Sequence, residues 1–197
     1  FVGLMVWGAI MALFLLVSYY LTPENFTLNL QWGKFIPLII ISLLLLPIQT
    51  AYEEVLFRGY LAQGVAGWTR QRWLALLIPS VLFALMHILN PEVAAHGFLM
   101  VMPQYLFFGL MFGATAILDD GIEVAMGAHA ANNIFLSIFV TNASSTLQTP
   151  ALLVQNNIDP LSELIWLIVC GSVFLFVLGK KYQWQFNLLQ TPVQPNN

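Results

Sequence analysis

Three ionisable side chains, Glu53, Glu54 and Arg58, lie within six residues and directly follow the apolar run 35–51. At the centre of a membrane-spanning helix a charged residue costs roughly 2.5–3.5 kcal/mol, whereas each Leu or Ile returns only about 0.3–0.6 kcal/mol. Three charges would therefore cancel most of the apolar gain of that helix. A fold that places this segment in a membrane must pair these groups or use them in function.

Helical spacing divides the three residues into two groups. Glu54 and Arg58 are at positions i and i+4 with the acid first, which is the favourable order for an ion pair. Glu53 has no such charged partner and lies about 100° around the helix from Glu54. We therefore predict that Glu54 and Arg58 form a buried pair that fixes helix packing, and that Glu53 points into a bundle interior as a candidate catalytic carboxylate.

The composition is that of an integral membrane protein. The chain is 59% hydrophobic and 8% charged, against about 25% charged residues in soluble domains. With six Lys and Arg residues and a net charge of −3, it has no basic patch for nucleic acid. The single cysteine, Cys170, excludes an internal disulfide and a multi-cysteine zinc site.

Apolar segments of about 20 residues predict an all-α, polytopic bundle of transmembrane helices. Six spans are expected, over 1–21, 35–62, 73–90, 98–118, 122–140 and 161–179. We expect one integral membrane domain over 1–188 and a polar C-terminal tail over 189–197. Because the chain opens inside an apolar stretch without the basic start of a signal peptide, we expect its true N-terminus to lie upstream, which leaves room for further helices.

Basic loop residues predict the orientation of this bundle. Arg70 and Arg72 follow the second expected span, and Lys180 and Lys181 follow the sixth. All four therefore fall on one side, whereas the loop 141–160, which has no Lys or Arg, falls on the other. Because basic loops are retained in the cytoplasm, we expect the side with the four basic residues to be cytoplasmic.

Two further polar clusters interrupt apolar segments. Phe83 and His87 share one helix face, so the ring can orient the imidazole. His129 and Asn133 share another face and would aim two hydrogen-bond donors at one point. Asn132 is an alternative donor, because the i+3 position is also near His129.

These motifs together resemble a known family. EExxxR at 53–58, FxxxH at 83–87 and HxxxN at 129–133 fall in this order on separate expected helices. This pattern is similar to that of the CAAX protease and bacteriocin-processing (Abi) family of intramembrane glutamic proteases. The likeness covers roughly 35–140 and includes the Gly-rich stretch 108–113. The resemblance implies an integral protein of a plasma or internal membrane of a prokaryote.

The resemblance implies hydrolysis of a peptide bond within the membrane. Glu53 would act as general base beside His87, and His129 with Asn133 would hold the oxyanion. General bases and preplaced donors are established sources of catalysis of this kind. The expected catalytic residues are therefore Glu53, His87, His129 and Asn133.

The same resemblance implies that Glu54 and Arg58 brace the site, and that no cofactor or metal takes part. One alternative is a zinc protease, since Glu53, His87 and His129 are a carboxylate and two imidazoles. A second is a non-proteolytic membrane scaffold or assembly protein that keeps the polar site for structure.

The expected partners follow from entry through the bilayer. A substrate that enters from lipid would be an apolar or lipidated peptide, or a segment of a membrane protein. The scaffold alternative would instead bind a partner membrane protein.

Overall fold

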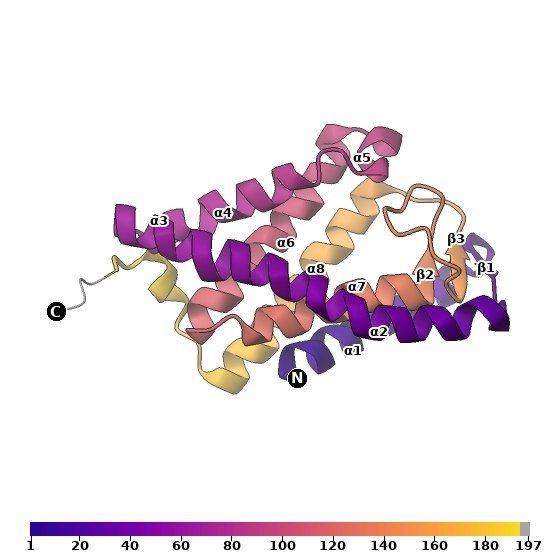
Figure 1. Cartoon of the computed structure of the whole chain (residues 1–197), viewed down its shortest axis with the longest axis horizontal. Coiled ribbons are helices and arrows are strands. Elements are labelled where there is room, and N and C mark those ends of the chain that lie inside the picture. Colours follow the sequence, from indigo (N-terminus) through magenta and orange to yellow (C-terminus); the bar gives the residue numbers. More distant parts are fainter. Residues whose placement is uncertain (194–197) are drawn as a thin grey trace.

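The computed structural model describes residues 1–193, and Figure 1 traces its elements. It is mostly helical, which confirms the all-α class. The α-helices are α1 (Val2–Leu21), α2 (Trp32–Glu54), α3 (Ala62–Thr69), α4 (Arg72–Met86), α5 (Pro91–His96), α6 (Phe98–Asp119), α7 (Glu123–Phe139) and α8 (Pro160–Tyr182). Short 3-10 turns cover Pro23–Asn25 and Phe186–Gln190, and Val55–Leu61 is π-helical.

The longest helix carries the charge cluster. α2, the π-helical segment and α3 run without a break over 38 residues, Trp32–Thr69. The π-helical segment begins directly after Glu54 and contains Arg58. π-Helical turns are rare and frequently occur at functional sites. The backbone thus departs from regular α-helix where the three ionisable side chains gather.

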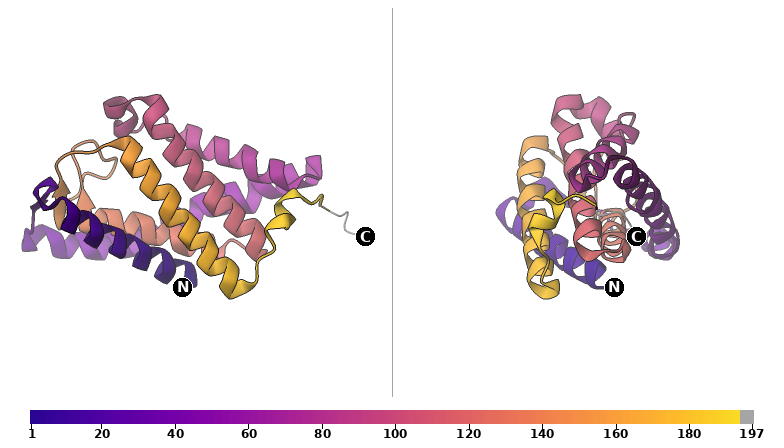
Figure 2. Two further views of the ribbon diagram at one scale, coloured as in Figure 1. Left: turned by 180° about the vertical axis from the view of Figure 1, so that it is seen from behind. Right: turned by 90° about the vertical axis from the view of Figure 1, so that its left-hand side faces the viewer.

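α7 lies at the centre of the bundle. It packs on α1 and α2 and also contacts α6. α6 in turn packs on α4 and α8, and Figure 2 shows α8 on the face opposite the viewer of Figure 1. In Figure 1, α2 and α4 diverge from the end where α3 joins them. Polar residues of α2, α4 and α7 can therefore face one another.

Buried aromatic side chains of α1, α6 and α8 form the main core. Trp7 of α1 meets Phe174 of α8 edge to face, with ring centroids 5.5 Å apart. Phe112 of α6 is fully buried in the same cluster. Edge-to-face contacts of this kind add to the apolar burial of the rings. Small residues of α7, such as Ala128, belong to the same cluster, so the core fixes the helix that carries His129.

Glycines let two helix pairs approach closely. A Cβ at Gly3 would lie 2.0 Å from the Val124 carbonyl oxygen, so α1 and α7 touch backbone to backbone. A Cβ at Gly109 would lie 2.8 Å from the Ser80 carbonyl oxygen and 2.9 Å from the Ser80 Cα, which joins α6 to α4. Small residues at helix contacts are typical of membrane bundles.

A small β-sheet at one end of the bundle departs from the all-helical expectation. Its strands are β1 (Phe26–Leu28), β2 (Val140–Thr141) and β3 (Leu153–Gln155), in the order β1-β3-β2. Phe26 pairs with Gln155 in the antiparallel half, and Val140 pairs with Leu153 in the parallel half. The strands are two or three residues long. Such short strands leave little periodic signal in a sequence.

The expected count of six spans is not confirmed. Four helices of the described chain are long and apolar enough to cross a membrane: Val2–Leu21, Trp32–Thr69, Phe98–Asp119 and Pro160–Tyr182. α4 is apolar but has 15 residues, and α7 has 17. α7 is packed against α1, α2 and α6, so most of its surface faces protein rather than lipid. Whether α4 and α7 also cross the membrane therefore stays a prediction from the sequence.

The C-terminal segment folds back on the start of α4. The Arg72 guanidinium donates to the Thr191 hydroxyl at 2.9 Å and to the Pro192 carbonyl at 2.7 Å. The Val193 amide donates to the Arg70 carbonyl at 2.9 Å. Residues 189–193 of the expected polar tail thus have defined contacts, and 194–197 lie outside the described residues.

Candidate active site

Glu54 and Arg58 form the buried ion pair that their spacing predicts. Arg58 Nη1 donates to Glu54 Oε1 at 2.9 Å, and both side chains are almost completely buried. Arg58 Nη2 donates to the Gly109 carbonyl at 3.2 Å. The pair therefore joins the long helix to α6. Because it is buried, loss of either partner would leave an uncompensated charge inside the protein.

Aromatic rings surround the guanidinium group. Its central carbon lies 4.6 Å from the Phe83 ring centroid, 5.5 Å from that of Phe112 and 5.9 Å from that of Phe57. A cation over an aromatic face is attracted by the ring quadrupole, and Arg is frequently found in this position. The rings thus compensate part of the desolvation of Arg58.

His129 lies between the two glutamates. Its Nδ1 is 2.7 Å from Glu54 Oε1, and its Nε2 is 3.8 Å from Glu53 Oε2. A carboxylate can only accept, so Nδ1 carries the proton in this contact. The ring of Phe112 stacks on the imidazole with centroids 4.9 Å apart. Glu54 therefore sets both the tautomer and the orientation of His129, and directs Nε2 toward Glu53.

The two oxygens of Glu53 have different surroundings. Gln49 Nε2, one turn earlier on α2, donates to Oε1. Oε2 is buried and has no hydrogen-bond partner within residues 1–193. The side chain as a whole is 19% exposed, so it reaches the edge of the bundle. Glu54 Oε2 is a second buried oxygen without a hydrogen-bond partner among these residues. Such atoms are unusual in folded proteins, and a bound water or a catalytic role is among their explanations.

Asn133 reaches the same place from α7. Its Nδ2 donates to Gln49 Oε1 at 3.1 Å, and its Oδ1 accepts from Asn132 Nδ2 at 3.2 Å. Asn132 is buried behind it and accepts from Trp7 Nε1 at 3.2 Å. Of the two adjacent amides, Asn133 is therefore the one that faces α2.

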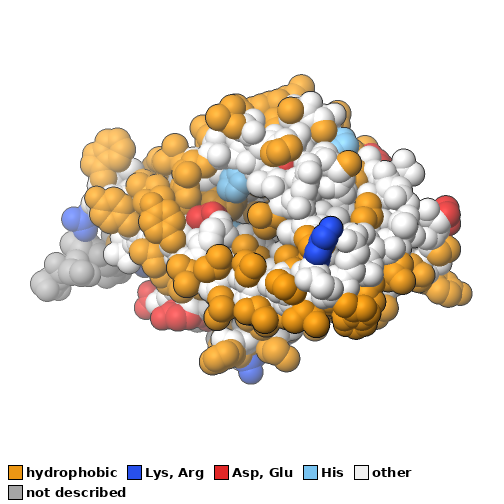
Figure 3. Space-filling model, turned by 45° about the vertical axis from the view of Figure 1, so that its right-hand side comes forward, with side chains coloured by type: hydrophobic (Ala, Val, Ile, Leu, Met, Phe, Trp, Pro, Cys, Tyr) orange, Lys and Arg blue, Asp and Glu red, His pale blue; other side chains and the backbone are white. Residues whose placement is uncertain are grey.

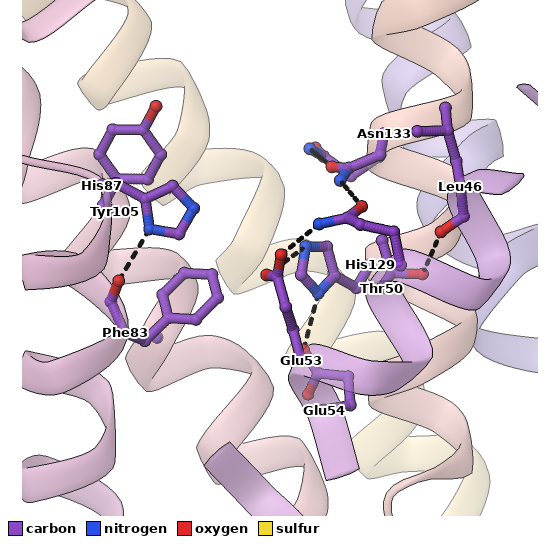
Figure 4. A network of polar contacts seen from close by, with 12 residues as sticks. Leu46, Thr50, Glu53, Glu54, Phe83, His87, Tyr105, His129 and Asn133 are labelled. Atoms are coloured by element: carbon purple, nitrogen blue, oxygen red, sulfur yellow. Dashed lines mark hydrogen bonds and ion pairs between the residues drawn. The ribbon is translucent and has the colours of Figure 1, made fainter. Parts of the chain in front are cut away.

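His87 approaches from α4. Its Nδ1 is 2.7 Å from the Phe83 carbonyl oxygen, which also leaves Nε2 as the free nitrogen. The imidazole stacks on Tyr105 with centroids 4.2 Å apart, and the Phe83 ring contacts both His87 and His129. Figure 4 shows His87 across from the group of Glu53, His129 and Asn133.

The four expected catalytic residues are thus not equally connected. Glu53, His129 and Asn133 share one network, directly or through Gln49. No hydrogen bond or ion pair in the described part of the chain joins His87 to the other three. The Phe83 ring contacts both imidazoles and is the aromatic link between the two parts of the site.

The donor set does not fit the zinc alternative. Within residues 1–193, no group of three or more His, Cys, Asp or Glu side chains is arranged to hold a metal ion. His87, which would complete a Glu and two-His set, lies across a gap from Glu53 and His129. A catalytic zinc site needs three protein ligands on one metal.

Three residues that contact the site were not predicted from the charged and histidine motifs. Gln49 and Trp7 belong to the network of Glu53, and Tyr105 stacks on His87. The i, i+4 spacing of Gln49 and Glu53 is a signal in the sequence, because such pairs meet on a helix. Trp7 and Tyr105 come from other helices, and only the tertiary fold brings them to the site.

The site lies on an apolar face of the molecule. Figure 3 shows histidine and acidic side chains close together there, surrounded by hydrophobic side chains. Exposed residues near the site include Ile48, Tyr52 and Met86. Exposed apolar side chains of this kind are typical of surfaces that contact a membrane or a protein partner.

Comparison with known proteins identifies the family. A family model described as type II CAAX prenyl endopeptidase Rce1-like matches residues 32–135, more than half of the chain. The chain belongs to this Rce1-like family. The matched region contains all three motifs at 53–58, 83–87 and 129–133. The expected resemblance to CAAX proteases is therefore confirmed, and several apolar helices agree with an integral membrane protein.

One relative of the Rce1-like chain is the uncharacterized protein YyaK of Bacillus subtilis (strain 168). It is 34% identical over 161 residues, which are 81% of this chain and 54% of the relative. The chain thus spans about half the length of this relative. No solved structure gives a significant match.

Proposed function

We propose that this chain is the catalytic core of an intramembrane endopeptidase that uses Glu53 to activate water. The observation that carries the proposal is Glu53 Oε2, which has no hydrogen-bond partner among the described residues and lies 3.8 Å from His129 Nε2. Glu54 Oε2 also has no hydrogen-bond partner there, but the Glu54 side chain is completely buried, whereas that of Glu53 is 19% exposed and open to water or substrate. A water molecule at Glu53 Oε2 would supply the missing hydrogen bond. Membership of a family of endopeptidases gives the reaction class.

The chemical step follows from these positions. Glu53 Oε2 takes a proton from water, the O–H bond breaks, and the oxygen bonds to the carbonyl carbon of the peptide. The carbonyl oxygen becomes an oxyanion, which needs preplaced donors. The proton then passes to the leaving nitrogen as the C–N bond breaks. A positioned general base contributes about 10²–10⁴ in rate to such steps.

The oxyanion donors come from α7. Asn133 has two amide hydrogens and uses one for Gln49, so one remains for the substrate. His129 donates from Nε2 only as the imidazolium, because its Nδ1 proton already binds Glu54. His87, whose Nε2 is free, would contact the substrate from α4. Loss of one oxyanion donor typically lowers the rate by about 10²–10³.

The substrate we propose is a lipidated or apolar peptide that enters from the bilayer. The site lies on an apolar face, and α2 and α4 diverge beside it. The family description names prenylated CAAX ends. A suitable probe is therefore a peptide that ends in farnesylated Cys, two aliphatic residues and a variable residue.

Cleavage of this probe in lipid vesicles tests the proposal. The purified protein should release the last three residues of the peptide, as measured by mass spectrometry, and should do so at the same rate after treatment with a metal chelator. Loss of a catalytic metal would abolish turnover. Cleavage that stops with chelator would favour the zinc mechanism, and no cleavage by folded protein would favour the scaffold.

A further inference from the structure

A chain of hydrogen bonds runs from the core to the candidate base. Trp7 Nε1 donates to Asn132 at 3.2 Å, Asn132 to Asn133 at 3.2 Å, and Asn133 to Gln49 at 3.1 Å. Gln49 Nε2 then donates to Glu53 Oε1. The chain links α1, α7 and α2 and ends at the residue to which we assign the base.

The chemistry of the two ends fixes the direction of every bond in this chain. An indole nitrogen can only donate, and a carboxylate can only accept. Each amide between them has one donor side and one acceptor side. If one amide were reversed, two donors or two acceptors would face each other. Trp7 and Glu53 together therefore hold the three amides in one orientation.

Gln49 lies between Asn133 and Glu53 in this series of hydrogen bonds. Its amide oxygen faces the donor of Asn133, and its amide nitrogen faces Glu53. It thus connects the candidate base to the candidate oxyanion donor. Gln49 is an exposed residue of α2. Helix packing therefore does not explain why an amide stands at this position.

We propose that Gln49 is a positioning residue for this reaction, an inference that rests on the proposed function. It binds Glu53 Oε1 and thereby leaves Oε2 as the oxygen that receives the proton from water. It also holds Asn133 so that the second amide hydrogen points to the oxyanion. One side chain sets the geometry of both the base and the donor.

Gln49→Met tests this role, because Met has a similar length and suits a lipid-facing helix. The matched control is Gln104→Met in α6, which removes an amide that donates to the Pro160 carbonyl at 3.0 Å. Both variants should fold, as judged by unfolding temperature in micelles. The farnesylated peptide serves as substrate for both, and kcat and KM are measured separately.

The expected result is a kcat lower by about 10- to 100-fold in Gln49→Met, with KM within about twofold of wild type. A misplaced base lowers the chemical step and leaves substrate binding intact. Gln104→Met should keep the wild-type kcat. An unchanged kcat in Gln49→Met, or a defect seen only in KM or in unfolding temperature, would overturn the inference.

A second measurement needs no substrate. The side-chain amide signal of Gln49 in a ¹⁵N–¹H spectrum is identified by its absence in Gln49→Met. Its bonded proton should move upfield in Glu53→Leu, which has no acceptor, and stay in place in Gln104→Met. If the chemical shift of this proton is the same in Glu53→Leu as in wild type, the hydrogen bond from Gln49 to Glu53 does not form.

The activity of Glu53→Gln, measured beside that of Gln49→Met, separates this inference from the proposed function. If Glu53→Gln cleaves the peptide at the wild-type rate, the proposed function fails, whatever the Gln49 variant does. If Glu53→Gln is inactive and Gln49→Met is fully active, the proposed function stands and the positioning role is wrong.

Discussion

At the scale of single residues, Glu54 serves two partners with one oxygen. Its Oε1 accepts from Arg58 and from His129, and the side chain is fully buried. The EExxxR spacing is enough to predict the pair of Glu54 with Arg58. It does not reveal the bond to His129, because that contact depends on how α7 packs on α2.

Glu54→Gln should therefore damage the fold more than Glu53→Gln does. The substitution removes the carboxylate that pairs with Arg58 in a buried site, and breaking a buried pair costs about 3–5 kcal/mol. We expect a lower yield and a lower unfolding temperature in micelles. Glu53→Gln is the control, since Glu53 is partly exposed and should keep wild-type stability. A stable but inactive Glu54→Gln would argue that the base is Glu54.

At the scale of elements, the sequence predicts helices well and their ends poorly. The segment expected over 122–140 is the helix Glu123–Phe139, because apolar periodicity is strong there. The segment expected over 35–62 extends to Thr69, and the π-helical turn after Glu54 has no signature in the residue pattern. The π-helical segment contains the buried Arg58, and only the packed structure shows it.

Helix contact at Gly109 gives a prediction at this scale. Gly109→Ala would place a Cβ 2.8 Å from the backbone of Ser80, so α6 must move away from α4. We expect a loss of about 1–3 kcal/mol in the free energy of unfolding. Gly8→Ala is the matched control, because its nearest neighbour would be the Ala131 Cβ at 4.0 Å. Equal unfolding temperatures for the two variants would contradict the close packing of α4 and α6.

At the scale of the whole molecule, the two ends differ in charge. The C-terminal segment contacts Arg70 and Arg72, so these residues lie at the end where α8 finishes with Lys180 and Lys181. The β-sheet places the loop after α7 beside the start of α2 at the other end. The sequence thus predicts that these four basic residues lie together, whereas it does not predict the sheet at the second end, whose strands are two or three residues long.

We propose that the basic end is cytoplasmic, as retention of basic loops predicts. Cysteines introduced near Arg70 and near Lys181 should react with a membrane-impermeant reagent from the cytoplasmic side. A cysteine in place of Ser145 should react only from the other side. Cys170→Ser provides the background without reactive thiols. Labelling of the Ser145 position from the cytoplasm would reverse the proposed orientation.

The role of Glu53 as the base is tested most directly by the kcat of Glu53→Gln on the farnesylated peptide, measured beside wild type at matched amounts of folded protein. The substitution keeps the size of the side chain and removes the proton acceptor. We expect kcat to fall by about 10² or more with an unchanged unfolding temperature, because a general base contributes at least that factor. A Glu53→Gln protein that cleaves the peptide at the wild-type rate would contradict the account.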